Sequence, residues 1–559
     1  MLYCSGSSRG WLRCARLQSR ADSSTARRLG LVALLGPVLI AFLLAADTAV
    51  ALPGWSTLSV PLSQGTRPQA AGAFGDVGVV VAGQGGAVAV STDAGRTWIR
   101  VSAAALTSST LRGVAFADAG HGVVVGDHAT VLIGARDAQG VFGWKAPTLT
   151  GEVTGGLRDV ALRGTVGYAV GTGGLVLQTV DGGASWRRES VAASADLNAV
   201  AMSADGQIVA AVGDHGTVLT KGEGAWRVAS TATSADLLDV ALPADSALNV
   251  LYCCSKRRVF SLRGTGALTP VPVQPSLPAG GAIKHLAMAE SRARTRLVVG
   301  GAHGWLAGLV LGGSAWVRQA GGATSPVTSL TAAGGGVCYA TTAGGRLERT
   351  LSGGAAFSLG LRTTPNAKDA HYRAIITAGA RVALSASTTI LAPGTLLLQA
   401  LPAGGAAWRA VAYGAPGATT VSVSETPDTN TSYRLRFVYA GRTAATGTKV
   451  PVGVRRKVSV SSTALRVRLH RVFRVRGSVA PSVPRGHYVQ VWTDRAGDRR
   501  LGSWHRISVG WTARLTDGRT FVSRVFGTPV RETYHLKVRV AGDGKHLEGW
   551  SPRITVSVR

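Results

Sequence analysis

Short apolar stretches recur at a regular spacing between residues 70 and 360 of this chain. They are rich in valine, leucine and alanine and are separated by glycine and polar residues. This pattern predicts short β-strands joined by tight turns rather than helices. Six copies of an opening strand start 40 to 46 residues apart, at Leu111, Leu157, Leu197, Leu237, Ile283 and Val327. An earlier unit near Ala71 makes a seventh copy.

Every unit has the same order of predicted strands. An opening strand is followed by an apolar strand that ends in glycine, a turn, a third strand such as Leu175–Leu177, and a fourth strand led by an aromatic residue in most units. Four short strands in about forty residues make one blade of a β-propeller, and blades bury their faces against each other. We therefore predict an all-β protein with a seven-bladed β-propeller over residues 52–362.

Two turns before the fourth strand carry the pattern S/T-x-D-x-G-x-T/S-W, called an Asp-box. The copies consist of Ser91, Asp93, Gly95, Thr97 and Trp98, and of Thr179, Asp181, Gly183, Ser185 and Trp186. In this spacing the aspartate accepts hydrogen bonds within its own turn, the glycine supplies a positive φ, and the tryptophan closes the hairpin. We expect the Asp-boxes to be architectural and assign no catalytic residue.

The order of opening strand, Val-Gly turn, Thr-Val-Leu strand and Asp-box resembles the bacterial neuraminidase (BNR) repeat superfamily. Residues 55–362 resemble most closely the photosystem II stability/assembly factor family. This resemblance implies an exported seven-bladed propeller without catalytic activity that binds a membrane-protein client during assembly. It carries over no client-binding residue, because such surfaces have no linear motif.

A sialidase-like glycoside hydrolase is the enzymatic alternative for Asp-box repeats. Sialidases share an Arg-Ile-Pro segment, which this chain lacks. Glycosidases need two carboxylates about 5 to 9.5 Å apart, and the spacing of the 19 acidic residues in 52–370 singles out no pair. Two facing carboxylates in the central pocket, one with a raised pKa, would favour an enzyme. A mouth lined by basic and small residues would favour a scaffold.

Histidine and aspartate recur in the turn after the second strand of alternate units. These weak candidates for a metal site are Asp127, His128, Asp214, His215 and His303. Equivalent turns of a propeller gather at one face, where such side chains can collect a metal ion. Both residue types also tolerate the left-handed conformation of a tight hairpin. We therefore favour a structural role for these turns, and we expect no cofactor.

The N-terminus has the pattern of an export signal. A basic segment ends at Arg28, an apolar run covers residues 29–46, and Ala49-Val50-Ala51 provides the small residues of a cleavage site. We predict a signal peptide over residues 1–51 that is cleaved after Ala51, with an uncleaved membrane anchor at residues 29–46 as the alternative. The expected location is extracellular or the cell envelope.

Three cysteines follow this leader, namely Cys253, Cys254 and Cys338. An odd number with two adjacent members is not a disulfide framework. We expect them to be buried small side chains, and one bridge from Cys253 or Cys254 to Cys338 is the alternative.

Positive charge is concentrated in the last third of the chain. Residues 371–559 contain 29 Lys and Arg against 8 Asp and Glu, whereas residues 52–370 contain 25 against 19. Alternating strands and a tyrosine-led strand late in each half, at Tyr433 and Tyr534, resemble immunoglobulin-like (Ig-like) β-sandwiches. We predict one such sandwich over residues 371–455 and a more basic one over residues 456–559.

Strand alternation places many arginines of this tail on solvent-facing sides. They either bind anionic cell-wall polymers or a membrane surface, or simply solvate the strands. Nucleic acid is not expected as a partner, because the sequence has no aromatic platform motif. The leading hypothesis is an exported non-enzymatic scaffold that binds a protein or glycan client. The alternative is a glycoside hydrolase with carbohydrate-binding accessory domains.

Overall fold

The computed structural model describes residues 50–559 apart from short gaps, of which the longest are 272–280 and 496–504. Two compact units divide the chain, Met1–Ala46 and Asp47–Arg559. The first unit, and with it the predicted apolar leader, lies outside the described residues. Within the described part, no helix has the length and apolar character needed to cross a membrane. Strands and short 3₁₀ turns build that part, and the all-β prediction is confirmed.

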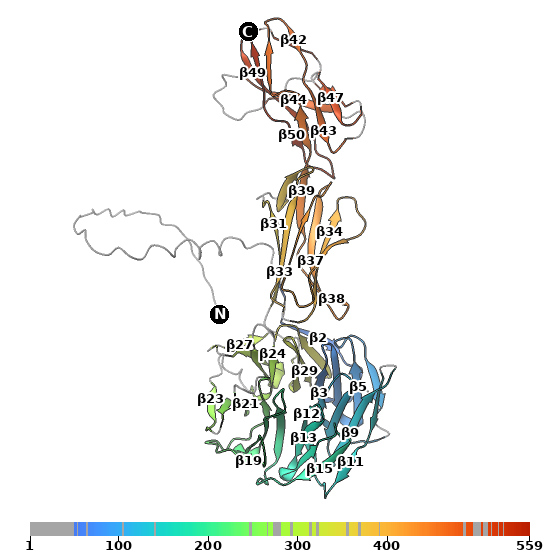
Figure 1. The fold of residues 1–559 in the computed structure, drawn as a ribbon, viewed down its shortest axis with the longest axis vertical. Helices are drawn as coiled ribbons and strands as arrows, with labels where there is room; N and C mark the ends of the chain where they lie inside the picture. Colours follow the sequence, from blue (N-terminus) through green and yellow to red (C-terminus); the bar gives the residue numbers. More distant parts are fainter. Residues whose placement is uncertain are drawn as a thin grey trace, which may run out of the picture. The chain divides into compact units, whose positions relative to one another are not determined.

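Residues 55–350 form successive four-stranded antiparallel sheets (Figure 1). The first blade contains β3 (Pro68–Phe74), β4 (Gly78–Gly83), β5 (Ala87–Ser91) and β6 (Ile99–Ser102). The second contains β7 (Leu111–Phe116), β8 (His121–Gly126), β9 (Thr130–Arg136) and β10 (Phe142–Lys145). The third contains β12 (Leu157–Arg163), β13 (Val166–Gly171), β14 (Val176–Thr179) and β15 (Ser185–Glu189), with β11 (Thr148–Thr150) added in parallel at its edge.

The next three blades repeat this arrangement. The fourth contains β16 (Leu197–Met202), β17 (Val209–Gly213), β18 (Val218–Lys221) and β19 (Arg227–Val228). The fifth contains β20 (Asp239–Ala241), β21 (Val250–Cys254), β22 (Val259–Arg263) and β23 (Thr269–Val271). The sixth contains β24 (Ile283–Glu290), β25 (Thr295–Gly301), β26 (Leu306–Val310) and β27 (Trp316–Gln319). Consecutive strands therefore supply each of these blades.

The last blade is completed by a strand from the other end of the domain. Its inner strands are β28 (Val327–Ala333), β29 (Val337–Thr342) and β30 (Arg346–Thr350), and its outermost strand is β2 (Trp55–Ser59). Trp55 is buried, and its Nε1 donates a hydrogen bond of 2.7 Å to Gln319 in the preceding blade. The opening strands contact each other in sequence, and β28 contacts β3. The propeller ring is thus closed by the pairing of β2 with β30 and by the packing of β28 against β3.

The hydrophobic core of the propeller is divided into clusters that each join two neighbouring blades. Val123 and Val125 of the second blade, for example, pack in one cluster with Leu157 and Trp186 of the third. Blade strands are apolar on both faces because each face meets a neighbouring blade. This packing explains why the repeats contain continuous apolar runs rather than a simple apolar–polar alternation.

Cys253, Cys254 and Cys338 are buried in these clusters and form no disulfide with one another. Burial raises the pKa of the Cys253 and Cys338 thiols to about 12. They act as small apolar side chains, as expected from the sequence.

The domain after the propeller consists of two packed sheets. One is formed by β1 (Val50–Leu52), β31 (Phe357–Thr364), β33 (Val382–Thr388) and β36 (Thr420–Glu425). The other is formed by β32 (Ala374–Thr377), β39 (Val450–Arg455), β37 (Thr431–Tyr439), β34 (Thr395–Pro402), β35 (Arg409–Tyr413) and β38 (Arg442–Thr446). We call the domain formed by these two sheets the first tail domain. Tyr433, Leu435 and Phe437 belong to its core.

Two strands of this domain fall near boundaries that the sequence placed differently. The predicted propeller range ended at residue 362, but β31 pairs with β33 of the first tail domain rather than with a blade. Its other neighbour is β1, in which Val50 lies opposite Leu359. The predicted cleavage after Ala51 therefore lies inside a paired strand.

The terminal domain has a larger and a smaller sheet. The larger contains β41 (Ala464–Val467), β51 (Ile554–Val558), β49 (Thr533–Val540), β44 (Tyr488–Arg495), β45 (His505–Arg506), β46 (Thr512–Arg514) and β50 (Gly549–Trp550). The smaller contains β40 (Lys457–Val460), β43 (Arg476–Ala480) and β47 (Thr520–Val522), and β42 (Val472–Phe473) pairs with β48 (Phe526–Gly527). The Ig-like assignment of both tail domains stays a prediction, because many sandwich families share this two-sheet architecture.

Candidate functional site

Both Asp-box carboxylates point into their own turns. Asp181 accepts hydrogen bonds from the backbone N–H of Ser185 at 2.9 Å and from the Ser185 hydroxyl at 2.6 Å. These bonds lower the pKa of Asp181 to about 2. The Trp186 indole donates to the Gly183 carbonyl at 3.0 Å, and Gly183 has a φ of 98°. Local bonds therefore occupy the carboxylate and leave it no role in the central channel.

The first Asp-box has the same internal bonds and one additional contact. Asp93 accepts from the backbone N–H groups of Arg96 and Thr97 at 3.0 and 2.8 Å. The Arg96 guanidinium donates to the carbonyls of Tyr439 and Ala440, at 2.7 and 2.8 Å, in the first tail domain. This turn therefore also holds the propeller to the domain that follows it.

The opening strands surround a central cavity of about 330 Å³. In six of the seven described opening strands, the pairing with the second strand skips the second residue, which marks a β-bulge. The skipped residues are Gln69, Arg112, Arg158, Asn198, Lys284 and Thr328. A bulge redirects a side chain out of the regular alternation. The repeat therefore places a polar residue from most blades at the same end of the channel.

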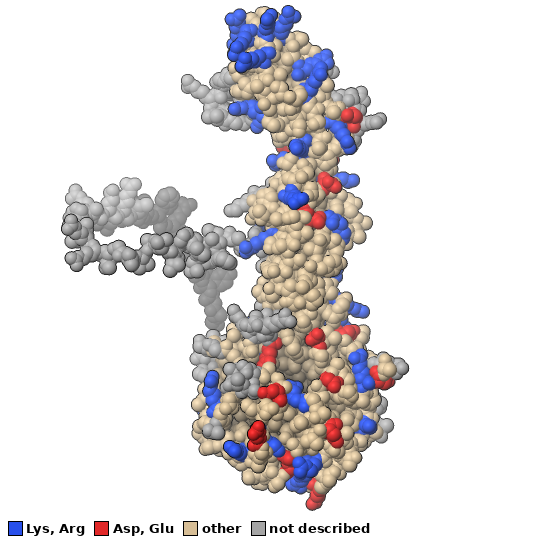
Figure 2. All heavy atoms as spheres, viewed as in Figure 1, with Lys and Arg blue, Asp and Glu red and all other residues tan. Residues whose placement is uncertain are grey.

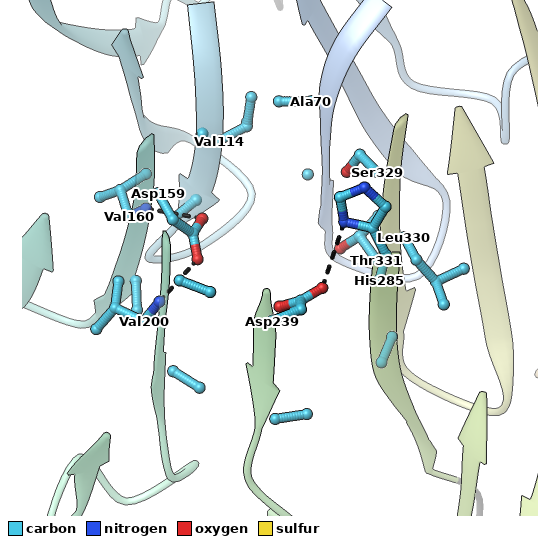
Figure 3. A pocket seen from close by; sticks show the side chains of 18 of the residues that line it. Ala70, Val114, Asp159, Val160, Val200, Asp239, His285, Ser329, Leu330 and Thr331 are labelled. Atoms are coloured by element: carbon cyan, nitrogen blue, oxygen red, sulfur yellow. Dashed lines mark hydrogen bonds and ion pairs between the residues drawn. The ribbon is translucent and has the colours of Figure 1, made fainter. Parts of the chain in front are cut away.

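In three opening strands, the side chain of the third residue accepts a hydrogen bond from the backbone of the next blade. Asp159 accepts a hydrogen bond from the Val200 N–H of the next blade at 2.9 Å (Figure 3). At the equivalent place, Asp239 accepts from Leu286 N–H at 3.0 Å, and the Ser329 hydroxyl accepts from Ala71 N–H at 3.1 Å. These bonds cross from the third to the fourth, the fifth to the sixth, and the seventh to the first blade. These bonds between blades were not predicted from the sequence.

Asp159 and Asp239 both line the central cavity, and a carboxylate pair with one raised pKa is the feature that would favour an enzyme. Burial, and secondarily the charge of Asp239, raise the pKa of Asp159 to about 7. However, the other oxygen of Asp159 accepts from Val160 N–H at 2.8 Å, and that of Asp239 from Val240 N–H at 2.8 Å. Every carboxylate oxygen of the pair thus accepts a bond from the channel wall. The arrangement favours a structural role over proton transfer.

Asp159→Asn is expected to change how stability depends on pH. The folded pKa of Asp159 lies above the value near 4 of an unfolded aspartate, so folding is penalised progressively as pH rises from about 4 to about 7. The unfolding free energy of the variant, relative to wild type, should therefore increase by on the order of a few kcal/mol across this window. Urea denaturation at pH 5 and pH 8 measures this difference. An equal difference at both pH values would contradict the assignment.

The mouth of the channel is ringed by charged side chains that are held in place. Arg112 pairs with Asp127 at 2.5 Å, and Arg158 pairs with Asp196 at 2.5 Å. Arg158 also donates to Asn198. Small residues of the opening strands complete the wall. This mouth of basic and small residues is the feature expected of a scaffold.

A second cavity of about 550 Å³ lies beside the fifth blade. Lys256, Arg257 and Arg258 form its rim at the turn between β21 and β22, and Phe260 and Leu268 contribute its apolar lining. All three basic side chains are exposed, and Lys284, at the start of the next opening strand, is exposed as well. Lys256 O accepts from Ile283 N–H at 3.0 Å, which brings the turn next to that strand. Among the described residues none of these four cations forms an ion pair.

The predicted metal candidates lie in equivalent turns of separate blades. His128, His215 and His303 have φ values of 56°, 57° and 57°, and Gly85 and Gly173 have the same conformation in other blades. Asp127 is paired with Arg112, and Asp214 accepts from Asn198 at 2.7 Å. No group of three metal-ligating side chains occurs in the part of the chain that the structure describes. The positive φ values of the three histidines are those of the left-handed conformation expected for these turns.

Residues 102–237, which contain the second, third and fourth blades, match the family model described as Photosynthesis system II assembly factor YCF48. The class of domain is a BNR-type β-propeller. It is related to the photosystem II assembly factors. The match does not reach the two tail domains. No curated protein has a significant match to this chain.

Similar solved structures include YCF48 bound to a D1 peptide, with 17% identity, a TM-score of 0.45, and coverage of 57% of this chain and 99% of that one. YCF48 from Cyanidioschyzon merolae has 17% identity, a TM-score of 0.43, and coverage of 53% and 98%. The WD40 β-propeller domain of Doa1 has 12% identity, a TM-score of 0.41, and coverage of 53% and 97%.

Proposed function

We propose that this protein is a non-enzymatic scaffold whose propeller binds a protein client through the basic rim beside the fifth blade. The observation that carries this proposal is the group of four exposed cations, Lys256, Arg257, Arg258 and Lys284, next to a cavity with an apolar lining. An acidic peptide segment with an apolar side chain matches both features: its carboxylates meet the cations, and its side chain enters the cavity. Desolvation of the apolar lining strengthens such a contact.

The relationship to assembly factors supports a protein rather than a small molecule as client. One of the similar structures is described as YCF48 bound to a D1 peptide, and the matched family is named for assembly. In this protein, Arg112 and Arg158 at the channel mouth are held in place by Asp127 and Asp196, so they are preorganised for an additional anionic group.

We further propose that the protein acts outside the cytoplasm, at the cell envelope. The N-terminal sequence pattern supports export, and the net positive charge of residues 371–559 supports association with an anionic surface. A glycan is an alternative client of the propeller. The raised pKa of Asp159 beside Asp239 is the feature that would favour the hydrolase alternative, but the backbone N–H groups bound to both carboxylates favour a structural role.

The charge-reversed triple variant Lys256→Glu, Arg257→Glu, Arg258→Glu is expected to lose its client. The full chain, carrying an affinity tag, is used to capture proteins from cross-linked envelope and cytosolic fractions. Client recovery from the envelope should fall at least tenfold, because three of the four cations become repulsive to an acidic segment. The matched control reverses three exposed arginines on outer strands, Arg188, Arg227 and Arg318, and should retain the client.

Equal recovery by both triple variants would contradict the proposed rim. Release of a sugar from a sialoside or glucan by the wild-type chain, lost in Asp159→Asn, would instead support the hydrolase alternative.

A further inference from the structure

The first tail domain presents a tryptophan surrounded by cations on the outer face of its larger sheet. The Arg434 guanidinium carbon lies 4.0 Å from the ring centroid of Trp408, and Lys449 Nζ lies 6.0 Å from it. Arg434 Nε also donates to Gln399 on the neighbouring strand at 2.9 Å. Tyr433 and Leu435 flank Arg434 on β37 and point into the core, so the arginine and the indole lie on the opposite, solvent-facing side.

Positive charge at this cluster is not neutralised by neighbouring carboxylates. Residues 371–455 contain only two acidic residues, and one of them, Glu425, pairs with Arg409 at 2.6 Å. Arg436 follows two residues after Arg434 on the same face of β37, and burial together with the Arg436 charge lowers the pKa of Arg434. A bound anion would relieve this like-charge contact.

The terminal domain carries a second cluster of the same composition on the outer face of its larger sheet. The rings of Trp492 and Trp550 lie 5.5 Å apart at an angle of 61°, and the Arg539 guanidinium lies 5.7 Å from each ring. Arg539 donates to Gln490 at 3.1 Å, and its Nε donates to Glu548 at 2.8 Å. Neither indole belongs to the core cluster of this domain.

The arginine of this second cluster connects both indoles to Glu548 and Gln490. Glu548 engages Arg539 and accepts from Trp550 Nε1 at 2.9 Å, which fixes the indole. Lys537 lies directly opposite Trp492 in the strand pairing, on the same face of the sheet. Residues 456–559 contain 21 Lys and Arg against 6 Asp and Glu. Figure 2 shows Lys and Arg gathered over the terminal domain, whereas both signs are mixed over the propeller.

An indole held beside fixed cations suits one class of ligand particularly well. The apolar C–H face of a sugar ring packs on an indole, and an acidic substituent of that ring reaches a neighbouring ammonium or guanidinium group. The two indoles of the terminal cluster contact each other edge to face at 61°, and both are partly exposed. Successive nucleic-acid bases favour flat stacking surfaces, which this edge-to-face pair does not provide.

We propose that the Trp408 cluster and the Trp492–Trp550 cluster are tandem binding sites for an acidic polysaccharide, with one sugar residue packed on each aromatic cluster. This inference specifies the surface association included in the proposed function and rests on its envelope location. Two sites in one chain raise the apparent affinity for a long polymer beyond that of either site, because the second contact is intramolecular.

The test measures binding of the full chain to polygalacturonate, with neutral dextran and single-stranded DNA as comparison polymers. Trp408→Ala and Trp492→Ala are each expected to weaken polygalacturonate binding about tenfold, and the double variant to weaken it about a hundredfold or more. Trp408→Phe should recover part of the loss, because it keeps an aromatic face. Trp144→Ala in the propeller is the matched control and should bind like wild type. Thermal unfolding of each variant checks that it is folded.

Three outcomes would overturn the inference. Unchanged binding by folded tryptophan variants would show that charge alone attracts the polymer. Equal losses for single-stranded DNA and polygalacturonate would identify a nucleic-acid surface. If the wild-type chain does not bind polygalacturonate, neither cluster is a site for an acidic polysaccharide. The triple variant of the propeller rim should bind polygalacturonate normally, and the double tryptophan variant should still capture the protein client, so the two proposals fail independently.

Discussion

Trp186→Ala is expected to lower the free energy of unfolding of the propeller by about 3–5 kcal/mol, because a large side chain is removed from a packed core. Trp186 is only 1% exposed and packs between the second and third blades with Val123, Leu157 and Leu177. Its indole N–H also satisfies the Gly183 carbonyl. Alanine therefore leaves both a cavity and a carbonyl without its donor. Urea denaturation followed by far-ultraviolet circular dichroism measures the loss.

The matched control is Trp98→Ala, which changes the same motif position in the first blade. Trp98 makes the equivalent bond to Gly95 at 3.0 Å but is partly exposed. Its replacement should cost clearly less, since less apolar surface is buried. Equal losses at both positions would mean that the hairpin bond, rather than packing between blades, provides the stability.

Asp543→Ala is expected to destabilise the junction between the two tail domains by about 3–5 kcal/mol, because it leaves a buried charge without its partner. Arg456, in the link between β39 and β40, is only 3% exposed. Its guanidinium donates to Asp543 at 2.6 Å and to the Ala541 carbonyl at 2.9 Å. The backbone on both sides is paired as well, with Leu547 N–H donating to Val454 O at 2.8 Å. Chemical denaturation and limited proteolysis of the full chain measure the effect.

Two further variants test the cause of this effect. Asp517→Ala changes an exposed turn aspartate of the same domain, which accepts only from its own turn at Arg519 and Thr520, and should have a much smaller effect. Adding Arg456→Met to Asp543→Ala removes the charge that was left behind and should restore much of the stability. A double variant as unstable as the single one would contradict the role of the buried charge.

The local elements of this protein follow from its sequence because they depend on residues close together in the chain. Each Asp-box closes within eight residues, and its carboxylate is bound by the turn that contains it, as with Asp181 and Ser185. The repeat of four short apolar strands likewise predicts blades, since a blade is made of consecutive strands. The all-β architecture and the relationship to BNR propellers could therefore be predicted from the sequence.

The channel residues were missed because their partners lie in other blades. A polar residue at the third position of several opening strands was the available signal. The bond from Val200 N–H to Asp159 nevertheless becomes visible only when two repeats lie side by side. The same holds for the basic rim, where the Lys256 turn meets the strand that begins at Ile283.

Ring closure and the outer faces of the tail were also decided by tertiary structure. Strand periodicity predicts which side chains share a face of a strand, but it does not predict which strand pairs with which. Pairing of β2 with β30 and of β1 with β31 joins segments about 300 residues apart. The contact of Arg434 on β37 with Trp408, which lies in the loop between β34 and β35, likewise depends on how these strands are arranged in the sheet. The sequence by itself thus determined the repeat, its hairpins and its charge. The structure decided the closed ring, the channel bonds and the aromatic–cationic surfaces, because these depend on contacts between residues far apart in the chain.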